Sequence, residues 1–330
     1  MNDLRTSRAV AAPSAPAGLV RFALSNEFGL VALIVLFGAW FAAATPGFAS
    51  PFNLFTLGRI MAIEIMIGFS MMVVIVTGGL NLSVGAIGVC SAMVFGWLSQ
   101  RFGLPLVLTI PAALAMGAAL GAINGQLIVR SGLHSFIITL ATLTSLRGIG
   151  LLITNGSTIS ISNDAFTNFA RADFLGVPSL FWMVIVVAIP AYVFLHLSRW
   201  GRYLFAVGSN REAARLSGVN VNRTIYLAYI LSSTCAAFVG ILLASRIGIG
   251  NATQAEGWEL QAIASSVIGG TSLFGAVGSV QGPLLGAFIL ATINNGANLL
   301  NVNSFWQRII TGALIILIVY FDQLRRRGSR

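Results

Sequence analysis

Neutral polar side chains are the groups in this chain whose types and spacing could do chemistry. They recur inside long apolar segments and include Asn81, Ser83, Asn124, Thr139 and Asn295. An amide supplies two donors and an acceptor, and a hydroxyl both donates and accepts. Such a set suits an uncharged, polyhydroxylated solute, whose own hydroxyls donate and accept in the same way. Because such residues also hydrogen-bond between packed membrane helices, a purely structural role stays open.

The groups that an enzyme would need are missing. Only nine acids occur, with no paired carboxylates, no nucleophile beside a base and no metal-ligand spacing. The chain has no lysine, so it cannot hydrolyse ATP through a lysine-bearing phosphate loop. Cys90 and Cys235 lie in apolar segments and predict neither a disulfide nor a metal site. We therefore expect a non-catalytic chain without cofactors, and any ATP that powers it should bind a partner subunit.

Charged residues inside the apolar segments are few. Glu64, Arg59 and Arg147 are the only deep candidates. An ion-coupled secondary carrier usually holds charges at membrane depth. Their scarcity weakens that hypothesis for a neutral polar solute but leaves it as an alternative.

The composition defines the elements that must position these residues. The 330 residues are 57% hydrophobic and 8% charged, with a mean hydropathy of +0.89. Soluble domains are about one quarter charged. We therefore expect an all-α polytopic membrane protein. The net charge of +10 comes from arginines at segment edges, which fits membrane orientation better than a nucleic-acid partner.

Apolar runs of near-membrane length predict about ten transmembrane helices. With the amino terminus inside, cytoplasmic segments hold thirteen arginines and outer segments three, which predicts that both termini are cytoplasmic. We expect a disordered cytoplasmic tail over 1–28, a transmembrane domain over 29–322 and a basic cytoplasmic tail over 323–330. The predicted spans are 29–45, 57–77, 83–99, 105–129, 135–154, 180–198, 225–245, 259–275, 282–300 and 305–322.

The longest predicted cytoplasmic loop between two spans, 199–224, contains a short helical pattern. Asn210 is a good N-cap, Glu212 suits the first turn, and Gly218 offers a stop. A short helix on such a loop suggests a docking element. A plain solvated loop that only sets orientation explains the same residues.

Two glycine-rich stretches resemble each other and suggest an internal repeat. Val76-Thr-Gly-Gly-Leu-Asn-Leu82 matches Val267-Ile-Gly-Gly-Thr-Ser-Leu273, and Gly-Ala-x-Gly follows each of them. Transporters are often built from repeats, although small residues also recur in membrane helices by chance.

Several blocks in order resemble the permease subunits of bacterial ABC importers for ribose and related monosaccharides. The resemblance covers roughly residues 50–325. The first block, Val76-Thr-Gly-Gly-Leu-Asn-Leu-Ser-Val-Gly85, is similar to the family's Gly-Gly-Ile/Val-Asp-Leu-Ser-Val-Gly. The others are 121–125 with 136–140 and 147–148, then 207–218, 259–273 and 294–307.

This resemblance implies a type II-like ABC importer permease in a bacterial inner membrane. It implies as partners a second permease copy in a homodimer or heterodimer, membrane lipid, a periplasmic sugar-binding protein and a cytoplasmic ATPase, often two fused nucleotide-binding domains. It makes the 210–218 segment a coupling helix seated in that ATPase, through Asn210, Arg211, Glu212, Ala213, Ala214, Arg215 and Gly218. It places near the solute pathway Asn81, Ser83, Asn124, Phe136, Thr139 and Asn295.

The chain also departs from the family pattern. Asn81 and Gln261 stand where the family frequently has Asp, and 133–135 replaces a common Ile-Pro-Pro. The lost carboxylates indicate a different solute or a permease that pairs with a non-identical sister. Permeases for branched-chain amino acids are relatives, so an amino-acid solute is a further alternative.

Overall fold

The chain is almost wholly helical in a computed structural model that describes residues 26–161 and 163–328. Most of the predicted amino-terminal tail, residues 1–25, lies outside the described residues. The helices are α2 (Asn26–Ala44), α3 (Pro51–Ile75), α4 (Val84–Phe102), α5 (Leu106–Ser131), α6 (Ser135–Thr154), α7 (Asp164–Arg171), α8 (Ser179–Tyr192), the π-helix η1 (Val193–Leu197), α9 (Arg199–Ser209), α10 (Arg211–Leu216), α11 (Val221–Ile247), α12 (Trp258–Ile268), α13 (Gln281–Leu299) and α14 (Ser304–Gly328).

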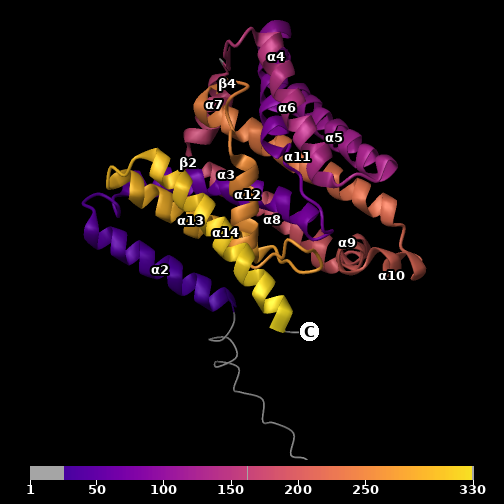
Figure 1. Cartoon of the computed structure of the whole chain (residues 1–330). Coiled ribbons are helices and arrows are strands. Elements are labelled where there is room, and N and C mark those ends of the chain that lie inside the picture. Colours follow the sequence, from indigo (N-terminus) through magenta and orange to yellow (C-terminus); the bar gives the residue numbers. More distant parts are fainter. Residues whose placement is uncertain (1–25, 162, 329–330) are drawn as a thin grey trace, which may run out of the picture.

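Two long helices, α3 and α11, form the centre of the molecule. Helix α3 is buried from Met61 almost without a break to its end, and α8, α11, α12 and α13 pack around it. Helix α11 also packs against α4 and α5. Figure 1 shows α4, α5 and α6 gathered at one end of the molecule and α2, α13 and α14 at the other. Because α3 and α11 are enclosed on most sides, their polar residues must find partners inside the protein.

Small residues let α5 and α11 approach closely. Gly117, Gly121 and Gly125 repeat every fourth residue and so share one face of α5. A Cβ at Gly121 would lie 2.5 Å from the carbonyl oxygen of Tyr229, and one at Gly125 would lie 3.1 Å from Cα of Tyr226. The sequence thus specifies this contact through spacing of small residues, as is usual between membrane helices.

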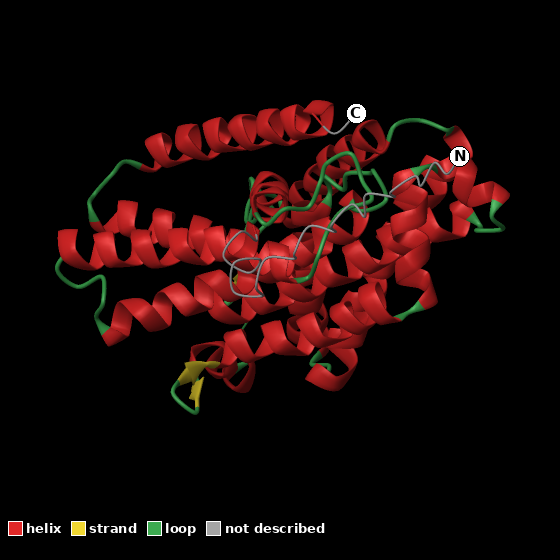
Figure 2. Ribbon diagram, turned by 90° about the horizontal axis from the view of Figure 1, so that it is seen from below, coloured by secondary structure: helices red, strands yellow, loops and turns green. Residues whose placement is uncertain are grey.

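Short irregular segments close the two ends of the helical body. At one end, β1 (Ile159–Ser160) pairs with β4 (Ile249–Gly250), and β2 (Asp173–Phe174) forms a hairpin with β3 (Val177–Pro178). We call this end the β4 side, and the opposite end, which carries α9 and α10, the α10 side. Figure 2 shows that helices dominate the described chain, with a visible strand pair only at its edge.

Six described helices are long and apolar enough to cross a membrane: 27–44, 51–75, 106–131, 135–154, 179–197 and 221–247. Each coincides with one of the ten predicted spans. The other four predicted spans overlap α4, α12, α13 and α14, and the count of ten and the orientation of the termini stay predictions.

The predicted span 259–275 is wrong as a continuous helix. Helix α12 has 11 residues and ends at Ile268. Two residues later, Gly270 adopts a φ of +91°. At 1.5 Å per residue the helix reaches only about half of a ~30 Å hydrocarbon core. A second difference lies at the carboxyl end, where α14 continues to Gly328 and so runs through most of the predicted tail. The division into tails and a transmembrane domain otherwise stays a prediction.

Candidate functional site

A break between α3 and α4 brings backbone polar groups into the protein interior. Helix α3 ends at Ile75 and α4 begins at Val84, and Gly78 in between has a φ of +77°. The amide of Leu80 donates to Oγ of Ser135 (3.1 Å), and its carbonyl accepts from the hydroxyls of Tyr229 (3.1 Å) and Thr139 (3.3 Å). Side chains from α6 and α11 therefore replace the helical hydrogen bonds that the break removes. Non-helical backbone at membrane depth requires such partners.

A chain of amides and hydroxyls extends from this break through four elements. The Asn81 amide nitrogen donates to Oγ of Ser232 (3.0 Å) and Ser233 (3.3 Å), both on α11. Its oxygen accepts from the hydroxyl of Ser83 at 2.7 Å, and Ser83 accepts from the amide of Asn124 on α5 at 2.9 Å. These five side chains have no solvent exposure.

The network ends on α6, where the Thr142 hydroxyl donates to Oδ1 of Asn124 at 2.6 Å. Because Asn81 donates twice and accepts once, its neutral amide matches the hydroxyls around it. A carboxylate at this position would instead accept from the hydroxyls of Ser232 and Ser233, which can also donate. The fit explains how an asparagine is accommodated where the resembling family usually has Asp.

The structure therefore joins some predicted pathway residues and separates others. Asn81, Ser83 and Asn124 share the network, and Thr139 lies beside it through Leu80. All four are buried against protein in this conformation. Their place in a solute pathway stays a prediction, because the same bonds serve to hold the break.

Phe136 and Asn295 lie elsewhere. Phe136 is exposed in the first turn of α6. Asn295 on α13 forms a reciprocal amide pair with Asn53 on α3, at 2.9 and 3.0 Å, and Asn53 also donates to the carbonyl of Phe48 at 2.8 Å. This pair fastens α13 to α3.

Sequence reasoning did not assign roles to Ser135, Tyr229, Ser232 and Ser233. Two adjacent serines inside an apolar segment indicate that the segment makes a polar contact. The sequence does not indicate which residue is the partner in that contact. Helix α11, which packs against α4 and α5, carries these serines to Asn81.

Two charged side chains in the spans, Arg59 and Arg147, pair with other protein groups. Arg59 donates to the Arg171 carbonyl (2.6 Å) and forms an ion pair with Asp173 (3.0 Å). Arg147 Nη2 lies 3.9 Å from Oε1 of Glu259 in the first turn of α12. Two of the three residues considered for ion coupling are therefore engaged by protein partners.

The predicted short helix on the α10 side is confirmed as a structural element. Helix α10 begins at Arg211, and Oδ1 of Asn210 accepts from the amides of Glu212 and Ala213, both at 3.0 Å. Gly218 follows with a φ of +81°. An exposed ion pair of 2.6 Å joins Glu212 to Arg215. Whether this helix docks an ATPase stays a prediction.

One expectation about α10 needs correction. The two alanines were expected to face a partner together, but only Ala213 is exposed. Ala214 is 5% exposed and packs into the core of the molecule. Neighbouring residues on a helix point about 100° apart, so one alanine faces inward when the other faces outward.

The preceding residues form the helix α9 within the predicted cytoplasmic loop 199–224. Oγ of Ser198 accepts from the Gly201 amide at 3.1 Å and so caps its first turn. Gly201, Leu204 and Val207 repeat every third residue and are all buried, so they pack one face of α9 against the spans.

The end of α9 meets both glycine-rich breaks. The Ala276 amide, in the break after α12, donates to the Val76 carbonyl at 3.0 Å. Gly208 packs against both groups, and a Cβ there would lie 2.8 Å from the Ala276 nitrogen and closer still to the Val76 oxygen. Next to this contact, Arg211 lines a cavity of about 210 Å³ together with Gly78 and other residues of the first break. We call the contact of Gly208, Val76 and Ala276 the junction.

The two stretches that resemble each other in sequence thus lie side by side. Each follows the end of a helix, α3 or α12, and both touch α9. The arrangement links the exposed helix α10, through α9, to the two glycine-rich breaks. An internal repeat itself stays a prediction.

Comparison with known proteins gives the same class of molecule. The family profile described as "Branched-chain amino acid transport system / permease component" matches residues 51–319. The chain belongs to this permease family. As a member it is a multi-pass inner-membrane transport subunit rather than an enzyme.

Individual relatives cover nearly the whole permease. The ribose import permease protein of Bacillus subtilis strain 168 is 40% identical over 303 residues, which cover 91% of this chain and 92% of the relative. The ribose import permease protein of Escherichia coli K12 is 36% identical over 311 residues, covering 92% and 95%. The L-arabinose ABC transporter permease protein of Azospirillum brasilense is 34% identical over 335 residues, covering 100% and 98%. No solved structure matches the chain.

Proposed function

We propose that this permease carries a monosaccharide or a related polyol across the inner membrane as part of an ABC importer. The relatives named for ribose and L-arabinose support the solute class. The neutral amides and hydroxyls around Asn81 are of the type that suits a polyhydroxylated solute. A separate cytoplasmic ATPase supplies the energy, and a periplasmic binding protein delivers the solute.

The observation that carries the mechanism is the junction. An ATPase that binds α10 would move a capped helix, and a rigid helix transmits displacement where a floppy loop would absorb it. Through Gly208 the movement reaches the breaks after α3 and α12 together. We therefore propose that the α10 side is cytoplasmic and that ATPase closure shifts both breaks.

One feature makes the first break a suitable moving part. Its backbone at Leu80 is held by side-chain hydrogen bonds from Ser135, Thr139 and Tyr229, each of which can be exchanged for another partner. By contrast, the helical hydrogen bonds of α3 and α11 must stay formed in the hydrocarbon. The amide network around Asn81 lies at the edge of the first break and would then face the solute in another conformation.

The test is uptake into proteoliposomes that hold the permease, its ATPase and its binding protein. Labelled ribose, arabinose, allose, xylose and leucine are supplied in turn, with and without internal ATP. Uptake of a sugar that requires ATP and persists when ion gradients are dissipated supports the proposal. Preferential leucine uptake would favour the branched-chain amino-acid alternative, and uptake that follows an ion gradient at clamped ATP would favour the secondary carrier.

A further inference from the structure

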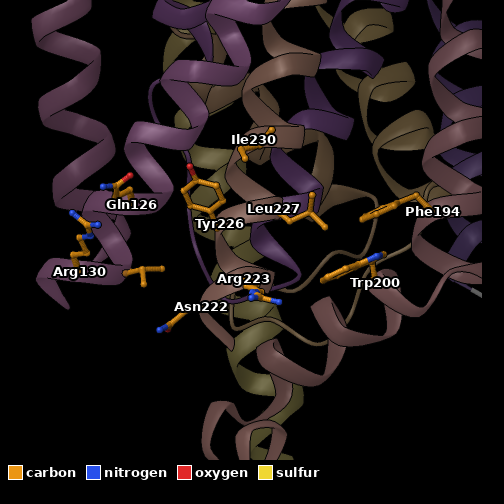
Figure 3. A pocket seen from close by; sticks show the side chains of 10 residues that line it. Gln126, Arg130, Phe194, Trp200, Asn222, Arg223, Tyr226, Leu227 and Ile230 are labelled. Carbon is orange, nitrogen blue, oxygen red and sulfur yellow. The ribbon is translucent and has the colours of Figure 1, made fainter. Parts of the chain in front are cut away.

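A groove on the α10 side has the chemistry of an anionic lipid site. It holds about 640 Å³, which is in the range of roughly 300–1,000 Å³ typical of small-molecule clefts. Helix α11 forms its floor, α5 one wall, and η1 with α9 the other (Figure 3). Its lining residues are Gln126, Val129, Arg130, Phe194, Trp200, Asn222, Arg223, Tyr226, Leu227 and Ile230. We call it the α5–α11 groove.

The polar end of the groove is positively charged. Arg130 lies in the last turn of α5 and Arg223 in the first turn of α11. Within the described part of the chain, neither side chain forms an ion pair, and no acidic residue lines the groove. Figure 3 shows Arg130 on the α5 wall, below Gln126, and Arg223 on the α11 floor, with Asn222 lower than both. Arginine binds phosphate oxygens through paired N–H donors, so this end is built for a phosphate group.

The rest of the groove is apolar. Leu227 and Ile230 continue along α11, one turn and nearly two turns from Arg223, toward the middle of the span. Phe194 closes the opposite wall from the π-helix η1, which begins three residues after Pro190. A free phosphate would gain nothing from this surface, whereas an acyl chain would be buried by it.

The depth of the groove matches a lipid headgroup. Its charged end coincides with the ends of two membrane-spanning helices, and Trp200 and Tyr226 line it there. Tryptophan and tyrosine favour the interface between hydrocarbon and water. Basic pockets between spans at this level are typical sites for anionic phospholipids.

We propose that the α5–α11 groove binds one anionic phospholipid, with its headgroup attracted by Arg130 and Arg223 and an acyl chain along Leu227 and Ile230. The site is separate from the amide network and does not depend on which solute is carried. One wall of the groove is formed by α5 and the other by η1 and α9, and α9 also forms part of the junction. A lipid bound in the groove would therefore hold α9 in place against α11.

The experiment measures lipid binding to the full-length permease by native mass spectrometry and by exchange in nanodiscs. The nanodiscs contain phosphatidylcholine alone or phosphatidylcholine with one fifth phosphatidylglycerol. We expect retention of phosphatidylglycerol over phosphatidylcholine. Arg130→Gln and Arg223→Gln should each weaken phosphatidylglycerol binding about fivefold, and the double variant about thirtyfold, as expected for loss of one interfacial charge each. Arg101→Gln, at the end of α4 on the β4 side, removes the same charge and should leave binding unchanged.

Two further arms separate the sources of a bound phosphate. Ile230→Trp fills the apolar part of the groove and leaves both arginines, so it should weaken phosphatidylglycerol binding while a thermal melt in phosphatidylcholine stays unchanged. Millimolar inorganic phosphate should not displace the lipid. Equal binding by the native chain and the double arginine variant would overturn the proposal. So would displacement by inorganic phosphate with no effect of Ile230→Trp, or crosslinking of Asn222→Cys to the ATPase or a second permease copy.

Discussion

Replacing Gly208 by alanine should uncouple ATP hydrolysis from transport. The new Cβ would lie 2.8 Å from the Ala276 amide nitrogen and nearer still to the Val76 carbonyl oxygen, whereas real Cβ contacts stay beyond 3.0 Å. Both neighbours are backbone atoms, so no side-chain rotation relieves the overlap. Helix α9 must therefore withdraw from the junction by about 1 Å, because a close-packed interior offers no free space.

The size of the effect follows from two opposing terms. Overpacking of this kind costs about 1–3 kcal/mol. Alanine is a better helix former than glycine by at most ~1 kcal/mol, which offsets only part of that cost. A net penalty of about 1–2 kcal/mol, confined to the conformation with a closed junction, would shift its population roughly 5- to 30-fold.

The assay compares solute uptake with ATP hydrolysis in reconstituted transporter. We expect Gly208→Ala to hydrolyse ATP while the amount of solute carried per ATP falls several-fold. Gly148→Ala is the matched control, because a Cβ there meets nothing within 4 Å. Native stoichiometry and native thermal stability in Gly208→Ala would refute the role of the junction. An ATPase that no longer co-purifies would instead place the defect in assembly.

Three other predictions concern the amide network, α10 and the orientation. Asn81→Leu leaves three buried hydroxyls without their partner and should destabilise the permease by about 1–3 kcal/mol, measured by thermal unfolding in detergent; unchanged stability would mean that the network does not hold the break. Ala214→Trp should prevent folding because Ala214 is buried, whereas Ala213→Trp should leave the membrane domain folded and abolish crosslinking of α10 to the ATPase; the opposite pattern would reverse the assigned faces. Reporter fusions after Asn163 should read as outside and those after Arg215 as inside, and the reverse reading at either site would overturn the proposed orientation.

Local chemistry made the short helix α10 predictable. A side chain that caps a helix bonds to amides two and three residues away, so Asn210, Glu212 and Gly218 carried the whole pattern. The same holds for the six long apolar helices, whose length and composition are local properties. The sequence also indicated which residues were polar in apolar surroundings.

Contacts between distant segments were not predictable in this way. Asn295 belonged with the pathway residues by type, yet it pairs with Asn53, 242 positions away. The apolar composition around α12 continues past Gly270 and so predicted a full span. The helix itself ends before Gly270, whose φ is positive. Ala214 points inward because of the way α10 packs against the core of the molecule, which the sequence of α10 does not specify.

The sequence by itself therefore determined that this chain is a helical membrane protein, because hydropathy, arginine placement and helix caps act over a few residues. That it is a permease was implied only by the resemblance of its ordered motif blocks to a known family. Only the tertiary structure decided that the two glycine-rich breaks meet each other and Gly208, and that Asn81 reaches serines on α11. The physical reason is that a hydrogen bond needs its two atoms within about 3 Å. That distance is set by the packing of whole helices, which no short stretch of sequence encodes.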